Sequence, residues 1–218
     1  TLNAWTQAAP GYNGVPLIEL RGDSAGAGAN GFTVDANDSE IRGFVINRFN
    51  LAGVWIGGAN NLVAGNYLGT DTAGTADLGN STDGVVLAGP TGGGNAATNT
   101  IGGIGTGDRN VISGNNDDGV SMDQSSGNVV IGNYIGLNAA GTAAIGNGGD
   151  GIAVQFASAN NTVGGTTAAH RNVIAGSGVA NLGIRDAGSS NNVVQGNYIG
   201  TNFDASAGLT NPGDGVQI

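Results

Sequence analysis

Residues 65–70 read GNYLGT, and close copies recur as GNYIGL at 132–137 and GNYIGT at 196–201, spaced 67 and 64 residues apart. A second motif falls between these copies, as RNVISG at 109–114 and RNVIAG at 171–176. The chain of 218 residues is therefore built from a unit of about 32 residues in two alternating versions. Such self-similarity predicts a stacked repeat architecture.

Each unit contains three short runs in which β-branched residues alternate with others, and Gly, Asn and Asp separate the runs. This pattern predicts strands rather than helices. The first run reads Asn-x-Val/Ile-x-Gly and begins at Asn61, Asn99, Asn128, Asn161 and Asn192. The second carries an apolar column at Ile46, Leu68, Ile112, Ile135, Ile174 and Ile199. The third has an apolar residue directly after Gly31, Gly53, Gly84, Gly119, Gly151, Gly183 and Gly215.

We therefore predict an all-β fold, a right-handed parallel β-helix (solenoid) of about seven three-stranded coils. A three-residue strand cannot bury its apolar face alone, so each strand must pair with the same strand one unit later. Residues 1–218 are expected to form a single domain, with 1–30 as an entry segment and partial N-terminal cap and 31–218 as repeat coils. The asparagines of the first run are predicted to stack at one corner, with their amides hydrogen-bonded along the axis.

The repeats resemble those of a known class of protein. Strings such as GNYIGT, RNVISGN and GDGV are similar to the right-handed parallel β-helix repeats of large secreted bacterial surface proteins. The stretches 16–21 (PLIELR) and 30–49 (NGFTVDANDSEIRGFVINRF) resemble the entry segment that opens such arrays. The resemblance covers nearly the whole chain. It implies the fold and an extracellular, cell-surface localisation, but it implies no particular biochemical activity.

Composition excludes several classes of partner. The formal net charge is −10 and the chain contains no lysine, whereas a nucleic-acid partner requires a basic face. No stretch is long and apolar enough to insert into a membrane, and there is no cysteine for a disulfide framework. The chain begins at Thr1 without a charged leader, so we expect a mature form or an excerpt.

Three tyrosines occupy one column. Tyr67, Tyr134 and Tyr198 precede the inward apolar residues of the second run, so a period of two directs them outward. Tyrosines on every second coil stand about 10 Å apart, a spacing that suits stacking on sugar rings. We favour the other interpretation, in which each tyrosine packs under the long loop that begins three residues later (70–82, 137–149 and 201–213).

The aspartates are candidate ligands, but their pattern favours a structural role. Asp71 opens the first long loop, where Asn138 and Asn202 stand in the other two, and a calcium site would not tolerate that exchange. We therefore predict turn caps, with bound calcium as the alternative and no other cofactor. The same interpretation applies to the aspartates before the third run, which are Asp83, Asp118, Asp150 and Asp214.

No complete catalytic set is present. Asp117 and Asp118 resemble the paired carboxylates of β-helix glycosidases, and together with Asp123 they are the candidates for a metal site. However, the Asn-Thr-Asp, Gly-His-Gly and Arg-Ile-Lys motifs expected of polygalacturonase-like enzymes do not occur. We assign no catalytic residue and no metal ligand. Asp186 aligns with the inward positions of Val154 and Ile218, and we expect a bulge there, with a bound ligand at Asp186 as the alternative.

These observations predict a structural or adhesive rod that presents loops on one side. The alternative is a carbohydrate-binding or polysaccharide-degrading β-helix protein, and polysaccharide is the candidate partner. The open ends of a β-helix expose unpaired strand edges. We therefore expect head-to-tail self-association into a filament, through Val216 and Ile218 at one end and Leu2 and Trp5 at the other.

Overall fold

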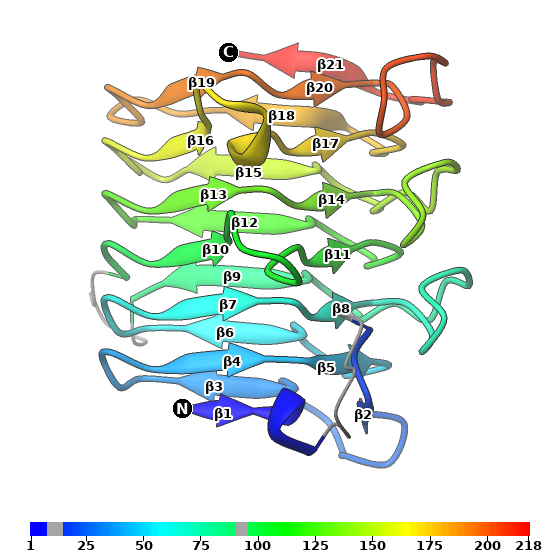
Figure 1. Cartoon of the computed structure of the whole chain (residues 1–218). Coiled ribbons are helices and arrows are strands. Elements are labelled where there is room, and N and C mark those ends of the chain that lie inside the picture. The colour runs from blue at the N-terminus through cyan, green and yellow to red at the C-terminus, as the bar shows by residue number, and fades with distance from the viewer. Residues whose placement is uncertain (8–14, 90–95) are drawn as a thin grey trace.

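The computed structural model describes residues 1–7, 15–89 and 96–218, and it confirms the predicted fold class. The chain forms a right-handed parallel β-helix whose coils stack in three parallel sheets of seven strands each (Figure 1). Two 3₁₀ helices, η1 (Ala4–Gln7) and η2 (Ala168–His170), lie outside the sheets. Residues 8–14 of the predicted entry segment 1–30 lie outside the described residues.

Each of the three predicted runs forms one sheet. Sheet A contains β1 (Leu2–Asn3), β4 (Glu40–Arg42), β7 (Leu62–Ala64), β10 (Thr100–Gly102), β13 (Val129–Ile131), β16 (Thr162–Gly164) and β19 (Val193–Gln195). Sheet B contains β2 (Ile18–Arg21), β5 (Phe44–Asn47), β8 (Tyr67–Leu68), β11 (Val111–Ile112), β14 (Tyr134–Ile135), β17 (Val173–Ile174) and β20 (Tyr198–Ile199). Sheet C contains β3 (Phe32–Val34), β6 (Val54–Ile56), β9 (Val85–Ala88), β12 (Val120–Asp123), β15 (Ile152–Gln155), β18 (Ala180–Ile184) and β21 (Asp214–Gln217).

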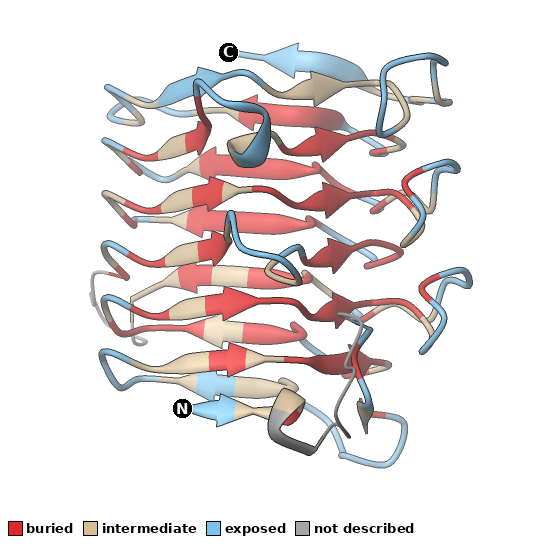
Figure 2. Ribbon diagram, viewed as in Figure 1, coloured by how far each residue is buried: buried red, intermediate tan, exposed pale blue. Residues whose placement is uncertain are grey.

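The core is a continuous column enclosed by the three sheets. In sheet B, Leu68 pairs with Ile112, which pairs with Ile135, so the predicted apolar column is in register. These three side chains are completely buried. Burial is greatest in the middle coils and falls at both ends of the rod, where fewer neighbours cover each strand (Figure 2).

Asparagine ladders occupy the corners between the sheets. The backbone N–H of Asn99 donates to Oδ1 of Asn128 (2.9 Å), and Nδ2 of Asn99 donates to the same oxygen (3.1 Å). The same bonds link Asn128 to Asn161, so the ladder predicted at this corner is confirmed. Two further ladders were not predicted, and they consist of Asn66, Asn110, Asn133, Asn172 and Asn197 before sheet B and Asn80, Asn115 and Asn147 before sheet C.

The long loops form a second layer outside sheet B. Loop 70–82 contacts loop 137–149 through a hydrogen bond from Ala139 N–H to the Gly74 carbonyl (2.8 Å). Loop 137–149 contacts loop 201–213 in the same way, through Phe203 N–H and the Gly141 carbonyl (2.9 Å). The three loops project on one side of the rod, as predicted (Figure 1). Asp71 Oδ1 accepts the backbone N–H of Thr75 (2.7 Å), which confirms its predicted role as a turn cap.

The predicted register was wrong in one coil. Val154 pairs with Ile184 rather than with Asp186, because the segment between β15 and β18 is two residues shorter than the average unit. Asp186 therefore lies in an exposed turn after β18, with φ at 73°, and its Oδ2 accepts the N–H of Phe156 (3.1 Å). A buried carboxylate is avoided by the change of register, and no bulge is needed.

The ladders give a first prediction. Asn133 is buried, and its Nδ2 donates to the Ile101 carbonyl (2.9 Å) and to Asn172 Oδ1 (3.0 Å). We expect Asn133→Ala to lower the free energy of unfolding by about 3 kcal/mol or more, because it leaves several buried partners unsatisfied. Chemical denaturation monitored by circular dichroism measures this loss. The control is Asn116→Ala at an exposed position, where a change below about 0.5 kcal/mol is expected. Similar losses in the two variants would show that the ladder contributes little.

Candidate functional site

The outer face of sheet C carries one row of side chains that point away from the core. Val54 and Ile56 are completely buried, so the strand period of two directs Trp55 outward between them. Its neighbours in the row are Thr33 on β3 and Val86 on β9. Because both neighbours are smaller than tryptophan, the indole ring stands beside open space.

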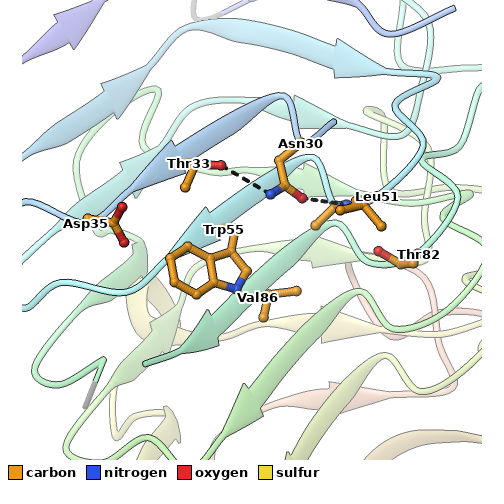
Figure 3. Close-up of a pocket in the computed structure, with 8 residues that line it drawn as sticks. Asn30, Thr33, Asp35, Leu51, Trp55, Thr82 and Val86 are labelled. Atoms are coloured by element: carbon orange, nitrogen blue, oxygen red, sulfur yellow. Dashed lines mark hydrogen bonds between the residues drawn. The ribbon is translucent and has the colours of Figure 1, made fainter. Parts of the chain in front are cut away.

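This space is a hollow of about 510 Å³ that spans β3, β6 and β9 (Figure 3). Its lining combines the indole ring with polar and small apolar groups, from Asn30, Thr33, Asp35, Leu51, Ala52, Thr82 and Val86. The Asn30 amide is fixed in place because Nδ2 donates to Thr33 Oγ1 (3.1 Å) and Oδ1 accepts the Ala52 N–H (3.0 Å). The hollow therefore has an aromatic wall and a rim of hydroxyl and amide groups.

Asp35 lies beside the six-membered ring of Trp55 (Figure 3). Gly57 is the position next to Asp35 across the strands, since Val34 pairs with Ile56. A Cβ on Gly57 would lie 2.6 Å from Trp55 Cη2 and 3.0 Å from Asp35 Oδ1, so ring and carboxylate meet above this glycine. Asp35 is exposed, and within the part of the chain that the structure describes it forms no ion pair.

Sequence reasoning missed Trp55, although a signal was present. The third-run motif places Val54 and Ile56 inward, so Trp55 between them had to be an outward aromatic residue on a strand. The tyrosines were the predicted aromatic candidates because they repeat in one column. A residue that occurs once in a repeated column is the stronger indication of a specific site.

A row of carboxylates runs along the edge of the same sheet. The backbone N–H of Asp118 donates to Asp83 Oδ1 (3.2 Å), and the N–H of Asp150 donates to Asp118 Oδ1 (2.7 Å). Asp150 in turn accepts the N–H of Ala180 (2.9 Å) and forms an ion pair with Arg185. The predicted capping role of these three aspartates is confirmed, and Arg185 neutralises the last of them.

Burial raises the pKa of two carboxyl groups in this row. It raises the pKa of Asp83 to about 7, and the nearby charge of Asp117 adds to the effect. Burial likewise raises the pKa of Asp118 to about 7. The hydrogen bond from the Asp150 N–H lowers this pKa, and the charges of Asp83 and Asp117 raise it further. Asp118, Asp150, Gln155 and Arg185 line a second hollow of about 230 Å³.

The candidate metal ligands Asp117, Asp118 and Asp123 do not form a metal centre. Among residues 1–7, 15–89 and 96–218, no three His, Cys, Asp or Glu side chains converge as metal ligands would. Asp123 Oδ1 instead accepts hydrogen bonds from Ser121 Oγ (3.0 Å) and Gln155 Nε2 (3.1 Å). Asp118 belongs to the row of carboxylates described above.

The tyrosine column lies beneath the loop layer. Tyr67 and Tyr134 are only 8% and 6% exposed, and Tyr198 is half-buried. Tyr67 forms part of the wall of a hollow of about 440 Å³, and Tyr134 packs against Leu137 at the start of its loop.

Glycines and arginines complete the cover over these rings. A Cβ on Gly141 would lie 2.7 Å from Tyr134 Cε2, so loop 137–149 lies directly against the ring. The guanidinium carbon of Arg109 lies 4.1 Å from the Tyr134 ring centroid, and that of Arg171 lies 3.9 Å from the centroid of Tyr198. The geometry therefore favours packing under the loops over sugar stacking on this column.

Of the residues proposed for self-association, three lie at the ends of the rod and one lies on its side. Leu2 is 50% exposed at one end of the rod, and Val216 and Ile218 are 46% and 94% exposed at the other (Figure 1). Trp5 does not belong to an end face. Its ring packs along the side of the coils against Gly43 and Gly65, so it has to be removed from the proposed edge.

No protein-family model and no curated protein sequence matches the chain. Among solved structures, the chain is similar to a double mutant of the periplasmic alginate epimerase AlgG, with a TM-score of 0.46 and 16% sequence identity. The match covers 86% of this chain and 46% of the epimerase, so the chain spans about half of that protein's length. At this identity the similarity concerns the course of the backbone. In the described residues, no helix has the length and apolar character needed to cross a membrane.

The raised pKa values give a second prediction. The folded state holds protons on Asp83 and Asp118 up to about pH 7, whereas an unfolded aspartate releases its proton near pH 4. The folded state therefore binds more protons between these values, and the free energy of unfolding should fall as pH rises from about 4 to 7. Asp118→Asn keeps the acceptor for the Asp150 N–H without the charge. We expect it to stabilise the protein at pH 8 by about 1–3 kcal/mol and to reduce the pH dependence.

Urea denaturation at several pH values measures this effect. Asp38→Asn, at an exposed aspartate outside the row, is the control and should leave the pH profile unchanged. An Asp118→Asn profile parallel to that of the parent protein would contradict the assignment.

Proposed function

We propose that this protein is an extracellular, adhesive β-helix rod that binds polysaccharide along the outer face of sheet C. The observation that carries the proposal is the hollow around Trp55. Sugar rings have apolar faces and hydroxyl edges, and the hollow offers an indole wall with Asn30, Thr33 and Thr82 at its rim. Such a combination suits a sugar better than a purely apolar ligand.

The geometry of the rod suits an extended polymer. The Trp55 hollow spans β3, β6 and β9, and the hollow beside Asp118 and Arg185 follows on the next strands of the same sheet, β12, β15 and β18. Six strands at a spacing of about 4.8 Å extend over about 24 Å. A linear polysaccharide aligned with the axis would contact both hollows.

The cell-surface location in this proposal rests on the resemblance of the repeats to those of secreted surface proteins. Acidic surface charge and the absence of lysine are compatible with that setting. Degradation of the bound polymer is the alternative function, with Asp117 and Asp118 as its candidate groups. Release of reducing ends or of unsaturated products during binding experiments would support that alternative.

A third prediction tests the binding site. The chain has two tryptophans, so Trp5→Phe leaves Trp55 as the only indole fluorophore. In this background, titration with a binding polysaccharide from a glycan array should change the fluorescence of Trp55. In the parent chain, Trp55→Ala should weaken binding about three- to tenfold in calorimetry, because it removes the aromatic contact. Phe156→Ala, at an exposed aromatic outside the hollow, should have no effect. Equal effects of the two substitutions would refute the site.

We also propose end-to-end association of the rod, through the exposed Leu2 at one end and Val216 and Ile218 at the other. The two ends differ, so such contacts do not close and would form filaments. We expect light scattering to show a mass that increases with concentration, and Ile218→Asp to abolish the increase. A constant monomeric mass at millimolar concentration would refute this fourth prediction.

A further inference from the structure

The charge of the outer face of sheet C limits which polysaccharides it accepts. Asp35 lines the first hollow, and Asp117 and Asp118 line the second. Arg185 is the one basic side chain in the described lining of either hollow, and its guanidinium is held by Asp150 and by Gln217 Oε1 (2.9 Å). The described linings of the two hollows therefore offer an anionic ligand no unpaired cation, and the net charge of −10 repels it further.

Trp55 and Asp35 form a pair suited to a cation. The π face of tryptophan attracts ammonium groups more strongly than the rings of tyrosine or phenylalanine do. A carboxylate beside the ring adds direct charge attraction. Ring and carboxylate both line the hollow. Only a glycine at position 57 allows them to approach each other, since a Cβ there would fall within 3.0 Å of both groups.

We infer that the Trp55 hollow recognises the ammonium group of an amino sugar, and that the ligand is a polysaccharide rich in unacetylated amino sugars. The ammonium group lies against the indole ring and the Asp35 carboxylate, while Asn30 and Thr33 contact the sugar hydroxyls. This inference rests on the proposed function and names the ligand class of the same site. A polyuronate has the opposite charge and is excluded by the same groups.

Three oligosaccharides of equal length test the inference. They are a glucosamine hexamer, the same hexamer with every amine acetylated, and a uronic acid hexamer. We expect the glucosamine hexamer to bind about tenfold more tightly than its acetylated form, as measured by calorimetry at low salt. Added salt should weaken only the glucosamine complex, because its extra affinity is electrostatic. The uronic acid hexamer should not bind.

Two carboxylate variants separate this site from general surface charge. Asp35→Asn should weaken glucosamine binding about two- to fivefold and leave the acetylated hexamer unaffected. Asp38→Asn removes the same charge three residues away, outside the hollow, and should change neither affinity. Gly57→Ala introduces a Cβ that clashes with both groups, so the ring or the carboxylate must move, and it should abolish the preference for the amine.

The possible failures are distinguishable. Equal affinity for the two glucosamine forms, or the same loss from Asp35→Asn and Asp38→Asn, overturns the inference and leaves polysaccharide binding intact. Failure of every oligosaccharide and polysaccharide to alter Trp55 fluorescence overturns both proposals. Binding of a lysine-rich peptide at the affinity of the glucosamine hexamer would identify a protein ligand and would also overturn the inference.

Discussion

The asparagine ladders are the interaction on which this structure depends. Five strands of sheet B have only two residues, which is too little to hold a register by backbone pairing alone. A buried amide must satisfy both its donor and its acceptor. In Asn133 the oxygen accepts from Asn110, and the NH₂ group donates to Asn172 and to the Ile101 carbonyl, all in neighbouring coils. The ladders thus fix the register of each coil, and with it the position of every outward side chain.

The aspartate row links neighbouring coils through the same hydrogen-bond geometry as the asparagine ladders, but ionised carboxylates in adjacent coils repel one another. Asp83 and Asp118 accept the backbone N–H of the next coil as an asparagine would, but their ionisation places like charges in neighbouring coils. Protonation near neutral pH relieves that repulsion, and the row ends where Ala180 replaces the next aspartate and Arg185 pairs with Asp150. Stability in this part of the rod is therefore linked to pH, whereas the neutral ladders are independent of it.

The fold was predictable from the sequence because the same kind of residue recurs at the same place of each strand in most units. The ladder through Asn99 and Asn128 followed from its regular spacing. The ladder through Asn66 and Asn110 was missed, although these asparagines belong to the GNY and RNV motifs that revealed the repeat. The register at Asp186 was wrong because Asn181 takes the place of the motif glycine, so Gly183 was aligned in its stead. Only pairing geometry distinguishes these two alignments.

The candidate site was harder to predict because it arises from departures from the repeat. If all coils were identical, each outward position would carry the same side chain in every coil. A row of side chains of similar size fills the outer face evenly and leaves no hollow. Trp55 interrupts a row that otherwise holds Thr33, Val86 and Ser121, and Gly57 interrupts the next row at the point where Asp35 lies beside it. The large ring of Trp55, the absent side chain of Gly57 and the unpaired carboxylate of Asp35 occur together once along the described part of sheet C. In a solenoid whose ladders dictate every position, specificity is obtained by changing the side chains at a few outward positions while the backbone stays the same.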